Sequence, residues 1–467
     1  MQPVFTQTGC EEMEEKTIAA IATAEGAGGI GVIRISGKKA KQIADRVFRP
    51  VSQKRWKNSA GYAAHYGKIV DAEEEIDEAI ALVFCSPKSY TGEDVVELSC
   101  HGGMYLTKRT LRAVLHAGAS LAEPGEFTKR AFLNGKIGLT QAESVMDLIA
   151  AKGKQAARAA LYQRQGALFH RIESIKQSLL SSAAHLSAWA DYPEEEIEHV
   201  ETAHLLESLD QSHGELESLL KSYDSGIAIK EGLETIIVGR PNVGKSTLMN
   251  LLSGCERSIV TEIPGTTRDI IEETILLGDI TLRLSDTAGI RQTEDPIEQI
   301  GVMKAKDKMQ TSHLVLAVFD ASNDLTEDDK ELIEELRDIP AVAIINKTDL
   351  HNKIDLKYIK DKIKHTVMIS AQLGEGIEAL TKAIAEITKT DRFDPSVGIL
   401  ANERQRAAAM EAKKCVEEAR NALLSGMTLD AVTVSIEGAI AELLSLTGER
   451  VNEAVVDEVF SKFCVGK

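Results

Sequence analysis

The sequence predicts a multidomain protein of the α/β plus all-α class, in which an α/β domain is inserted into a helical one. Its 467 residues are too many for a single hydrophobic core, and about three domains are expected at this length. Residues 233–387 alternate short apolar runs with helical stretches, which is typical of a doubly wound, mostly parallel sheet covered on both faces. Residues 140–190, in contrast, are rich in Ala, Leu and Gln and contain no proline.

The N-terminal part, residues 1–135, is predicted to form a compact α/β domain. Residues 30–35 (IGVIRI) and 79–84 (AIALVF) are apolar runs of strand length, bounded by Gly and by Ser or Pro. Helical stretches lie between such runs from residue 16 to residue 120.

The helical domain is expected in two pieces, residues 136–226 and 389–467, on either side of an inserted domain at 227–388. A long helix is predicted because six apolar residues recur at steps of three and four: Leu168, Ile172, Ile175, Leu179, Ala183 and Leu186. Pro193 and the acidic residues after it end that helix, and residues 201–222 read as another. After Pro395 the chain returns to Ala- and Glu-rich helical sequence as far as residue 446.

Composition limits the class of protein. The chain is 43% hydrophobic and 27% charged, as soluble proteins are, and no run approaches the roughly 18 apolar residues of a membrane span. A net charge of −18 argues against nonspecific nucleic-acid binding by the whole molecule. The six cysteines are scattered, and Glu11, Glu12, Glu14 and Glu15 do not fit a signal peptide. We therefore expect a cytoplasmic protein without a membrane segment.

A phosphate-binding loop is predicted at residues 239–246 (GRPNVGKS), which follow a strand-like run and precede a helical one. Glycines let backbone N–H groups close around a phosphate, and the helix N-terminus adds its positive end. Lys245 is expected to reach the β- and γ-phosphates, and Ser246 to bind Mg²⁺. The predicted contacts from this loop are Asn242, Val243, Gly244, Lys245, Ser246 and Thr247.

Further motifs in the expected order indicate that the nucleotide is GTP and that the inserted domain is a P-loop GTPase domain. A carboxylate at Asp349 can accept hydrogen bonds from the N1–H and 2-amino groups of guanine, which adenine does not offer. Residues 265–269 (GTTRD) fit a mobile switch, in which Thr267 is the expected second Mg²⁺ ligand. The other predicted contacts are Asp286, Thr287, Ala288, Gly289, Asn346, Lys347, Ser370 and Ala371.

The catalytic residue is not settled by these motifs. Small signalling GTPases carry a water-orienting Gln directly after the Asp-Thr-Ala-Gly motif, and this chain has Ile290 there. Another side chain must orient the attacking water. The acidic candidates in the same segment are Glu294, Asp295 and Glu298.

Seven short stretches on either side of the GTPase motifs carry a further signal: 17–23 (TIAAIAT), 31–37 (GVIRISG), 96–103 (VELSCHGG), 124–136 (PGEFTKRAFLNGK), 139–144 (LTQAES), 402–404 (NER) and 463–467 (FCVGK). In this order and over nearly the whole length, they resemble the bacterial tRNA-modifying GTPase family MnmE (also called TrmE). Two departures are mild: residue 24 is Ala where the family has Pro, and residue 465 is Val where Ile is usual.

The resemblance implies an N-terminal domain that binds folate and forms a homodimer. It also implies an FAD-dependent partner protein, together with which a heterotetramer modifies C5 of the wobble uridine of certain tRNAs. The product carries an aminomethyl or carboxymethylaminomethyl group, whose one-carbon unit comes from a tetrahydrofolate. GTP hydrolysis in this family is accompanied by dimerisation of the G domains around K⁺.

Carried over by motif, four residues look like contacts to 5-formyltetrahydrofolate: Arg34, Glu97, Lys136 and Lys467. Asn242 looks like the K⁺ ligand, and Thr261, Ile263 and Thr266 match the loop that completes the shell of K⁺; Thr261 and Thr266 are also expected at the GTP site. Among the acids, Glu298 matches the water-orienting glutamate of the family. Arg268 and Arg291 flank the switches, and Cys464 is expected to be catalytic by resemblance alone.

Two other interpretations use the same motifs. A ribosome-assembly switch GTPase would carry a different RNA-binding module, although the flanking segments contain no RNA-binding motif or basic stretch. Alternatively, the N-terminal segment is only a dimerisation platform. The sequence does not indicate which tRNAs are substrates, whether glycine or ammonium is the nitrogen donor, or what Cys464 does.

Overall fold

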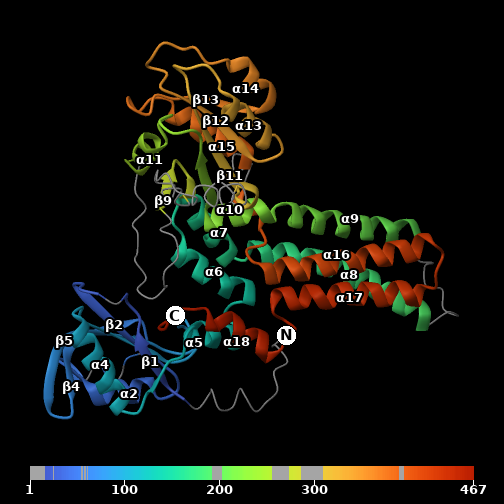
Figure 1. Ribbon diagram of the computed structural model, residues 1–467. Coiled ribbons are helices and arrows are strands. Elements are labelled where there is room, and N and C mark those ends of the chain that lie inside the picture. Colours follow the sequence, from blue (N-terminus) through green and yellow to red (C-terminus); the bar gives the residue numbers. More distant parts are fainter. Residues whose placement is uncertain are drawn as a thin grey trace, which may run out of the picture. The chain divides into compact units, whose positions relative to one another are not determined.

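The computed structural model describes residues 16–24, 26–53, 56, 59, 61–191, 202–254, 273–284, 309–388 and 394–467 (Figure 1). The chain divides into two compact units. Unit 1 comprises Met1–Met146, Ile172–His213 and Ala408–Lys467, and unit 2 comprises Asp147–Arg171 and Gly214–Ala407.

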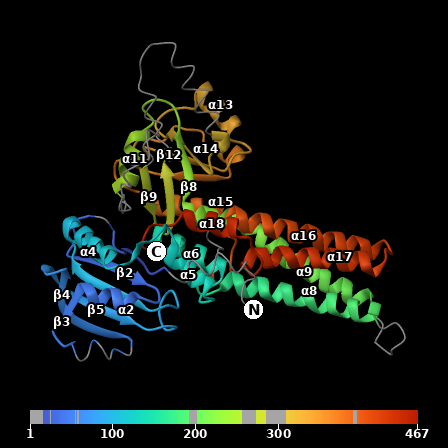
Figure 2. The same cartoon turned by 90° about the horizontal axis from the view of Figure 1, so that it is seen from below.

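Unit 1 contains a seven-stranded sheet in the order β3-β4-β5-β6-β2-β1-β7. Helices α2 (Ala40–Val47) and α4 (Met104–His116) lie against it, with Ile43, Ala44 and Val114 in the shared core (Figure 2). The strands predicted at 30–35 and 79–84 are confirmed as parts of β2 and β5. The strand bounds are β1 Ile18–Ile21, β2 Ile30–Ser36, β3 Phe48–Pro50, β4 Ala63–Asp71, β5 Glu74–Phe84, β6 Val95–His101 and β7 Ser120–Leu121.

A second core in unit 1 joins the C-terminal residues to the end of the N-terminal domain. Phe132 on α5 (Glu126–Leu133) packs with Phe460 on α18 (Glu453–Ser461) and with Phe463 of the tail. Leu139 and Val145 of α6 (Leu139–Ala150) belong to the same cluster. The end of the chain is thereby joined to α5 and α6.

Four long helices, most of whose residues belong to unit 1, lie side by side in both views (Figures 1 and 2): α8 (Ala167–Asp191), α9 (Thr202–Lys221), α16 (Glu403–Leu424) and α17 (Leu429–Thr447). The predicted apolar face is confirmed, since all six of its residues from Leu168 to Leu186 are buried. Polar contacts also join these helices, including Ser178 Oγ to Ser208 Oγ at 3.0 Å and Arg420 Nε to Asp210 Oδ1 at 2.5 Å.

Unit 2 is built on a six-stranded sheet in the order β13-β12-β11-β8-β10-β9, with only the β9–β10 pair antiparallel. One face is covered by α11 (Lys245–Gly254) and α15 (Ile377–Thr388), and the other by α13 (Glu327–Glu335) and α14 (Leu356–Lys362). The predicted doubly wound, mostly parallel sheet is therefore confirmed. Its strands are β8 Leu233–Val238, β9 Glu273–Leu277, β10 Ile280–Leu284, β11 Leu314–Asp320, β12 Ala341–Asn346 and β13 His365–Met368.

Unit 2 also contains α7 (Lys154–Arg164), α10 (Tyr223–Glu231) and the short 3-10 helix η2 (Pro395–Val397). Lys230 of α10 joins two neighbouring segments, since its Nζ donates to the Ala401 carbonyl after η2 at 2.7 Å and pairs with Asp147 Oδ1 of α6 at 2.9 Å. Unit 2 thus includes segments on either side of the sheet as well as the sheet itself. The domain boundaries proposed from sequence, 1–135, 136–226, 227–388 and 389–467, stay a prediction.

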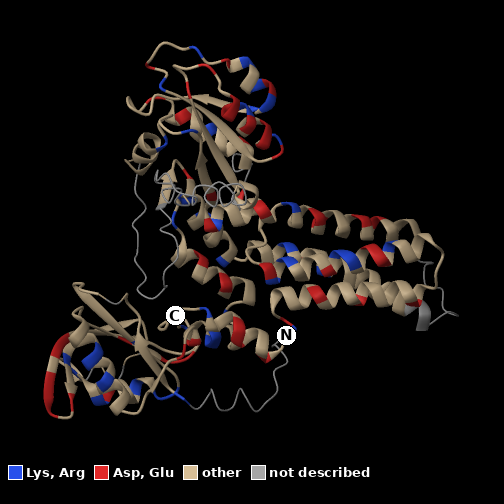
Figure 3. Ribbon diagram, viewed as in Figure 1, with Lys and Arg blue, Asp and Glu red and all other residues tan. Residues whose placement is uncertain are grey.

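Charge is spread unevenly over the ribbon (Figure 3). Six acidic residues gather at the end of β4, at the turn after it and along β5: Asp71, Glu73, Glu74, Glu75, Asp77 and Glu78. Among the described residues, none of the helices has the combination of length and apolar character that a bilayer crossing requires.

Candidate functional site

The loop between β8 and α11 has the backbone of a phosphate-binding loop. Gly239, Asn242 and Gly244 have φ values of 142°, 64° and 98°, in the region that favours glycine and tolerates asparagine. A Cβ at Gly239 would overlap the Val318 carbonyl, and one at Gly244 would overlap the Asn346 amide. Glycine is therefore required at both ends of this turn by close packing as well as by conformation.

Lys245, the first residue of α11, turns its ammonium back into this loop. Its Nζ donates to the carbonyls of Gly239 at 2.6 Å and Arg240 at 2.8 Å. Burial lowers the pKa of Lys245 below its ordinary value. A phosphate in the loop would supply the negative charge that this partly desolvated ammonium favours. Ser246 and Thr247 follow at the exposed start of the same helix.

Asn346, at the end of β12, connects the loop to the motifs that are predicted to recognise the base. Its buried side chain donates from Nδ2 to the Val243 carbonyl at 2.9 Å and accepts at Oδ1 from the Ala371 amide at 3.0 Å. The parallel strands β8, β12 and β13 end at the same side of the sheet, so that three motifs far apart in sequence meet at this side chain.

Lys347 and Asp320 form the next contact along this edge. Lys347 Nζ donates to the Asn242 carbonyl at 2.8 Å and pairs with Asp320 Oδ2 at 2.6 Å. Burial by itself would raise the pKa of Asp320, but hydrogen bonds from Lys347 and Ser322 outweigh it and hold the pKa below its ordinary value.

Asp349 presents a carboxylate where the base is expected. Its Oδ1 accepts a hydrogen bond from Ser370 Oγ at 2.6 Å, and Ser370 is fully buried whereas Asp349 is exposed. The Ser370 hydroxyl also accepts from the Leu373 amide at 3.3 Å. The Asp349 carboxylate is thus held by buried Ser370 and remains accessible to a ligand, as recognition of paired N–H donors requires.

Many predicted GTPase residues lie outside the described part of the chain. These are Thr261, Ile263, Thr266, Thr267, Arg268, Asp286, Thr287, Ala288, Gly289, Ile290, Arg291, Glu294, Asp295 and Glu298.

In unit 1, Arg34 and Glu97 are direct neighbours across the antiparallel strands β2 and β6. Arg34 Nε lies 2.8 Å from Glu97 Oε1, and Arg34 Nη1 donates to the Gly466 carbonyl of the tail at 3.4 Å. The guanidinium carbon is 5.6 Å from the ring centroids of both Tyr90 and Phe127. The structure therefore brings together two of the residues predicted for folate and the chain end.

The tail is held closely against this part of the sheet. A Cβ at Gly466 would overlap the Ile21 carbonyl of β1, and the Gly125 amide donates to the Cys464 carbonyl at 3.3 Å. The Cys464 thiol is free and exposed. Lys467 follows Gly466 directly, and Lys136 donates to the Pro87 carbonyl at 2.9 Å, on the loop that carries Tyr90.

Known proteins match the sequence of this chain over nearly its whole length. The tRNA modification GTPase MnmE of Thermoanaerobacter pseudethanolicus is 43% identical over 458 residues, which are 97% of this chain and 99% of that protein. The protein of the same name from Symbiobacterium thermophilum is 44% identical over 459 residues, 97% of this chain and 100% of the relative. The chain belongs to the MnmE family of tRNA modification GTPases. It is accordingly a GTPase.

Two family models match successive parts of this MnmE-family chain. The GTP-binding protein TrmE N-terminus model matches residues 17–136, and the MnmE helical domain model matches residues 139–464. Among solved structures, the G domain of the FeoB iron transporter of T. maritima is 26% identical and covers 33% of this chain and 98% of its own, with a TM-score of 0.26.

Sequence reasoning missed the side chains that surround Arg34. Tyr90 and Phe127 were not singled out, nor was Arg130, which pairs with Glu93 and Glu126. Phe127 and Arg130 lie within the stretch 124–136 that carries the family resemblance, which is the one signal that could have found them.

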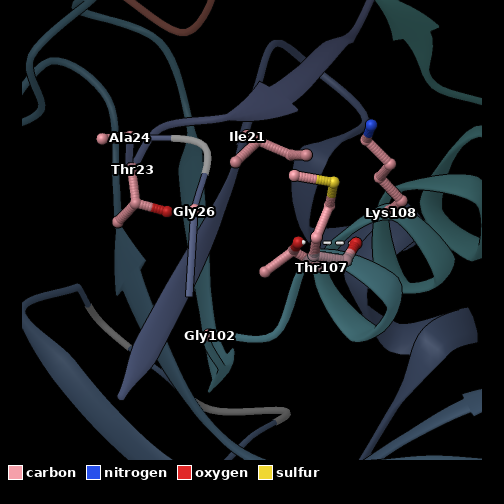
Figure 4. Close-up of a pocket in the computed structure, with 8 residues that line it drawn as sticks. Ile21, Thr23, Ala24, Gly26, Gly102, Thr107 and Lys108 are labelled. Atoms are coloured by element: carbon pink, nitrogen blue, oxygen red, sulfur yellow. Dashed lines mark hydrogen bonds between the residues drawn. The ribbon is translucent and has the colours of Figure 1, made fainter. Parts of the chain in front are cut away.

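A pocket in unit 1 lies between the end of β1, the residues after it and the start of α4 (Figure 4). Thr107 at its wall donates to the Gly103 carbonyl at 3.1 Å. None of the predicted site residues lines this pocket. The residues that line it are Ile21, Thr23, Ala24, Gly26, Gly102, Met104, Thr107 and Lys108.

Proposed function

We propose that this protein is a K⁺-activated GTPase that modifies C5 of the wobble uridine in certain tRNAs together with an FAD-dependent partner protein. The product carries an aminomethyl or carboxymethylaminomethyl group, and the one-carbon unit comes from 5-formyltetrahydrofolate or a related tetrahydrofolate. The observation that carries the proposal is the meeting of Arg34, Glu97 and the chain end at one place in unit 1. Family membership favours tRNA modification over a ribosome-assembly switch.

The folate assignment is supported by the chemistry of these groups. The Glu97 carboxylate can accept from the N–H edge of a pterin, and the Arg34, Lys136 and Lys467 cations suit the glutamate carboxylates. Glu97 is 19% exposed and Arg34 16% exposed, so both are partly desolvated and still reachable. The rings of Tyr90 and Phe127 hold the guanidinium in one orientation.

The GTPase assignment is supported by the loop geometry. The Ser246 hydroxyl at the start of α11 suits Mg²⁺, with Thr267 as its expected second ligand. Asn242 has a positive φ and is exposed, and its amide oxygen is a neutral ligand of the type that K⁺ takes; Thr261, Ile263 and Thr266 would complete that shell. A cation there would place positive charge against the β- and γ-phosphates. We assign hydrolysis to Glu298, a homodimer as the active form, and the cytoplasm as the location.

Folate binding by the full chain is the direct test. Equilibrium dialysis should detect binding of 5-formyltetrahydrofolate to the unmodified protein and a loss of about 10-fold or more in Arg34→Met, because a hydrogen bond to a charged group is removed. Lys68→Met is the matched control, since Lys68 pairs with Glu75 at 2.8 Å on the same sheet. The proposal fails if the unmodified protein binds no folate, or if the control loses as much affinity as Arg34→Met.

A further inference from the structure

Arg130 on α5 is the most buried cation near the predicted folate site, with a side chain only 3% exposed. Its guanidinium contacts its own helix and two other segments. Nη2 lies 2.8 Å from Glu126 Oε1, and Nη1 lies 3.0 Å from Glu93 Oε1. Nη1 also donates to the Lys16 carbonyl at 2.9 Å. The fork geometry of arginine permits all of these bonds at once, which a lysine cannot reproduce.

Both carboxylates depend on this cation, because each is largely removed from water. Glu93 is 17% exposed and Glu126 11% exposed. Each is completed by one further donor: Ser36 Oγ donates to Glu93 Oε2 at 2.6 Å, and the Glu123 amide donates to Glu126 Oε2 at 2.9 Å. Removing Arg130 would leave the Glu93 and Glu126 carboxylates without their shared cation in a poorly solvated place. Their like charges would then repel each other.

Each carboxylate belongs to a segment that also carries one of the rings around Arg34. Glu126 directly precedes Phe127 on α5, and Glu93 lies three residues after Tyr90 on the loop before β6. The two segments also meet directly, since the Tyr90 hydroxyl lies 2.9 Å from Thr128 Oγ1. A displacement of either carboxylate would therefore move a ring that contacts the Arg34 guanidinium.

We propose that Arg130 is a positioning residue for folate binding, which acts through Glu93 and Glu126 to hold Tyr90 and Phe127 against Arg34. The inference rests on the proposed function, because it assigns to Arg130 a part in building that same site. Arg130 is not expected to touch the ligand. Its loss would release the rings and allow the Arg34 side chain to leave the orientation in which it faces Glu97.

The chain offers a matched control for loss of a buried cation. Lys176 on α8 is 7% exposed and, like Arg130, is held by two carboxylates: its Nζ lies 2.9 Å from Glu449 Oε1 and 2.6 Å from Glu173 Oε2. It belongs to the helical part of unit 1. Lys176→Met should therefore cost stability in the way Arg130→Met does, without affecting the rings around Arg34.

The test compares 5-formyltetrahydrofolate affinity and melting temperature in full-length Arg130→Met, Arg130→Lys and Lys176→Met. Both Met variants should have a lower melting temperature than the unmodified protein. When binding is measured well below that temperature, only Arg130→Met should bind 5-formyltetrahydrofolate about 10-fold more weakly. Arg130→Lys should lie between, because the cation remains and the fork is lost. GTP hydrolysis should be unchanged in all three.

A loss of less than about threefold in Arg130→Met, or an equal loss in Lys176→Met, overturns the inference. If Arg130→Met does not fold, Arg130→Lys decides by the same threefold limit. Absence of folate binding to the unmodified protein would instead contradict the proposed function, so that the two failures are distinguishable.

Discussion

Asp349→Asn should change the nucleotide preference of this protein without changing its fold. Asp349 Oδ1 accepts from Ser370 Oγ at 2.6 Å, and the asparagine oxygen can accept the same bond. The new amide nitrogen would then face the base. Guanine offers two donors at that edge, so that donor would meet donor, whereas xanthine offers a carbonyl oxygen in place of the 2-amino group.

The expected size of the change follows from the bonds lost. Hydrogen bonds to a charged acceptor contribute about 1.5–3 kcal/mol each. Loss of two corresponds to roughly 3–6 kcal/mol, or about 10²- to 10⁴-fold weaker GTP binding. Since the substitution is nearly isosteric at an exposed position, the free energy of unfolding should change by less than about 0.5 kcal/mol.

Competition of GTP and XTP against a fluorescent guanine nucleotide measures this change directly. Asp349→Asn should bind XTP more tightly than GTP, and the unmodified protein should show the reverse order. Asp355→Asn is a useful control, because Asp355 is an exposed carboxylate that caps α14 in the same unit. If Asp349→Asn keeps GTP affinity within about threefold of the unmodified protein, our account of base recognition is wrong.

Four further outcomes are expected. Glu298→Ala should retain GTP affinity while kcat falls on the order of 10²–10⁴-fold, and a kcat within about twofold of the unmodified protein would return the role to Glu294 or Asp295. K⁺ should accelerate GTP turnover well above Na⁺, and Asn242→Ala should abolish that difference; equal rates in the two salts would contradict the K⁺ site. Cys464→Ser should hydrolyse GTP and bind folate normally but form no modified uridine with the flavoprotein partner, and normal product would show that the thiol is dispensable. Asn346→Ala should lower the unfolding free energy of the GTPase domain by roughly 2–6 kcal/mol, because the buried Val243 carbonyl and Ala371 amide each lose a partner, and an unchanged denaturation midpoint would refute it.

The inserted domain could be predicted from sequence because local signals agree there. An apolar run before residue 239, glycines at 239 and 244 and a helical run from 245 specify a strand, a turn and a helix without distant contacts. The long helix α8 was predictable for the same reason, since its apolar residues keep one period from Leu168 to Leu186.

The surroundings of Arg34 could not be predicted in that way. Arg34 and Glu97 are 63 residues apart, and only the register of β2 against β6 makes them neighbours. Arg130 is buried by contacts with Lys16 and Glu93, which are 114 and 37 residues away, as well as with Glu126 on its own helix, and helical propensity alone would place this arginine on the surface. Such contacts depend on tertiary packing, which local propensity does not encode.

Nucleoside analysis of bulk tRNA from cells that lack this gene tests the central claim most directly. The deletion should remove aminomethyl and carboxymethylaminomethyl groups from C5 of wobble uridine, and the unmodified gene should restore them. Arg34→Met, assayed in the same strain, should restore little of the modification, whereas Lys68→Met should restore all of it. A full set of modified wobble uridines in the deletion strain would contradict the account.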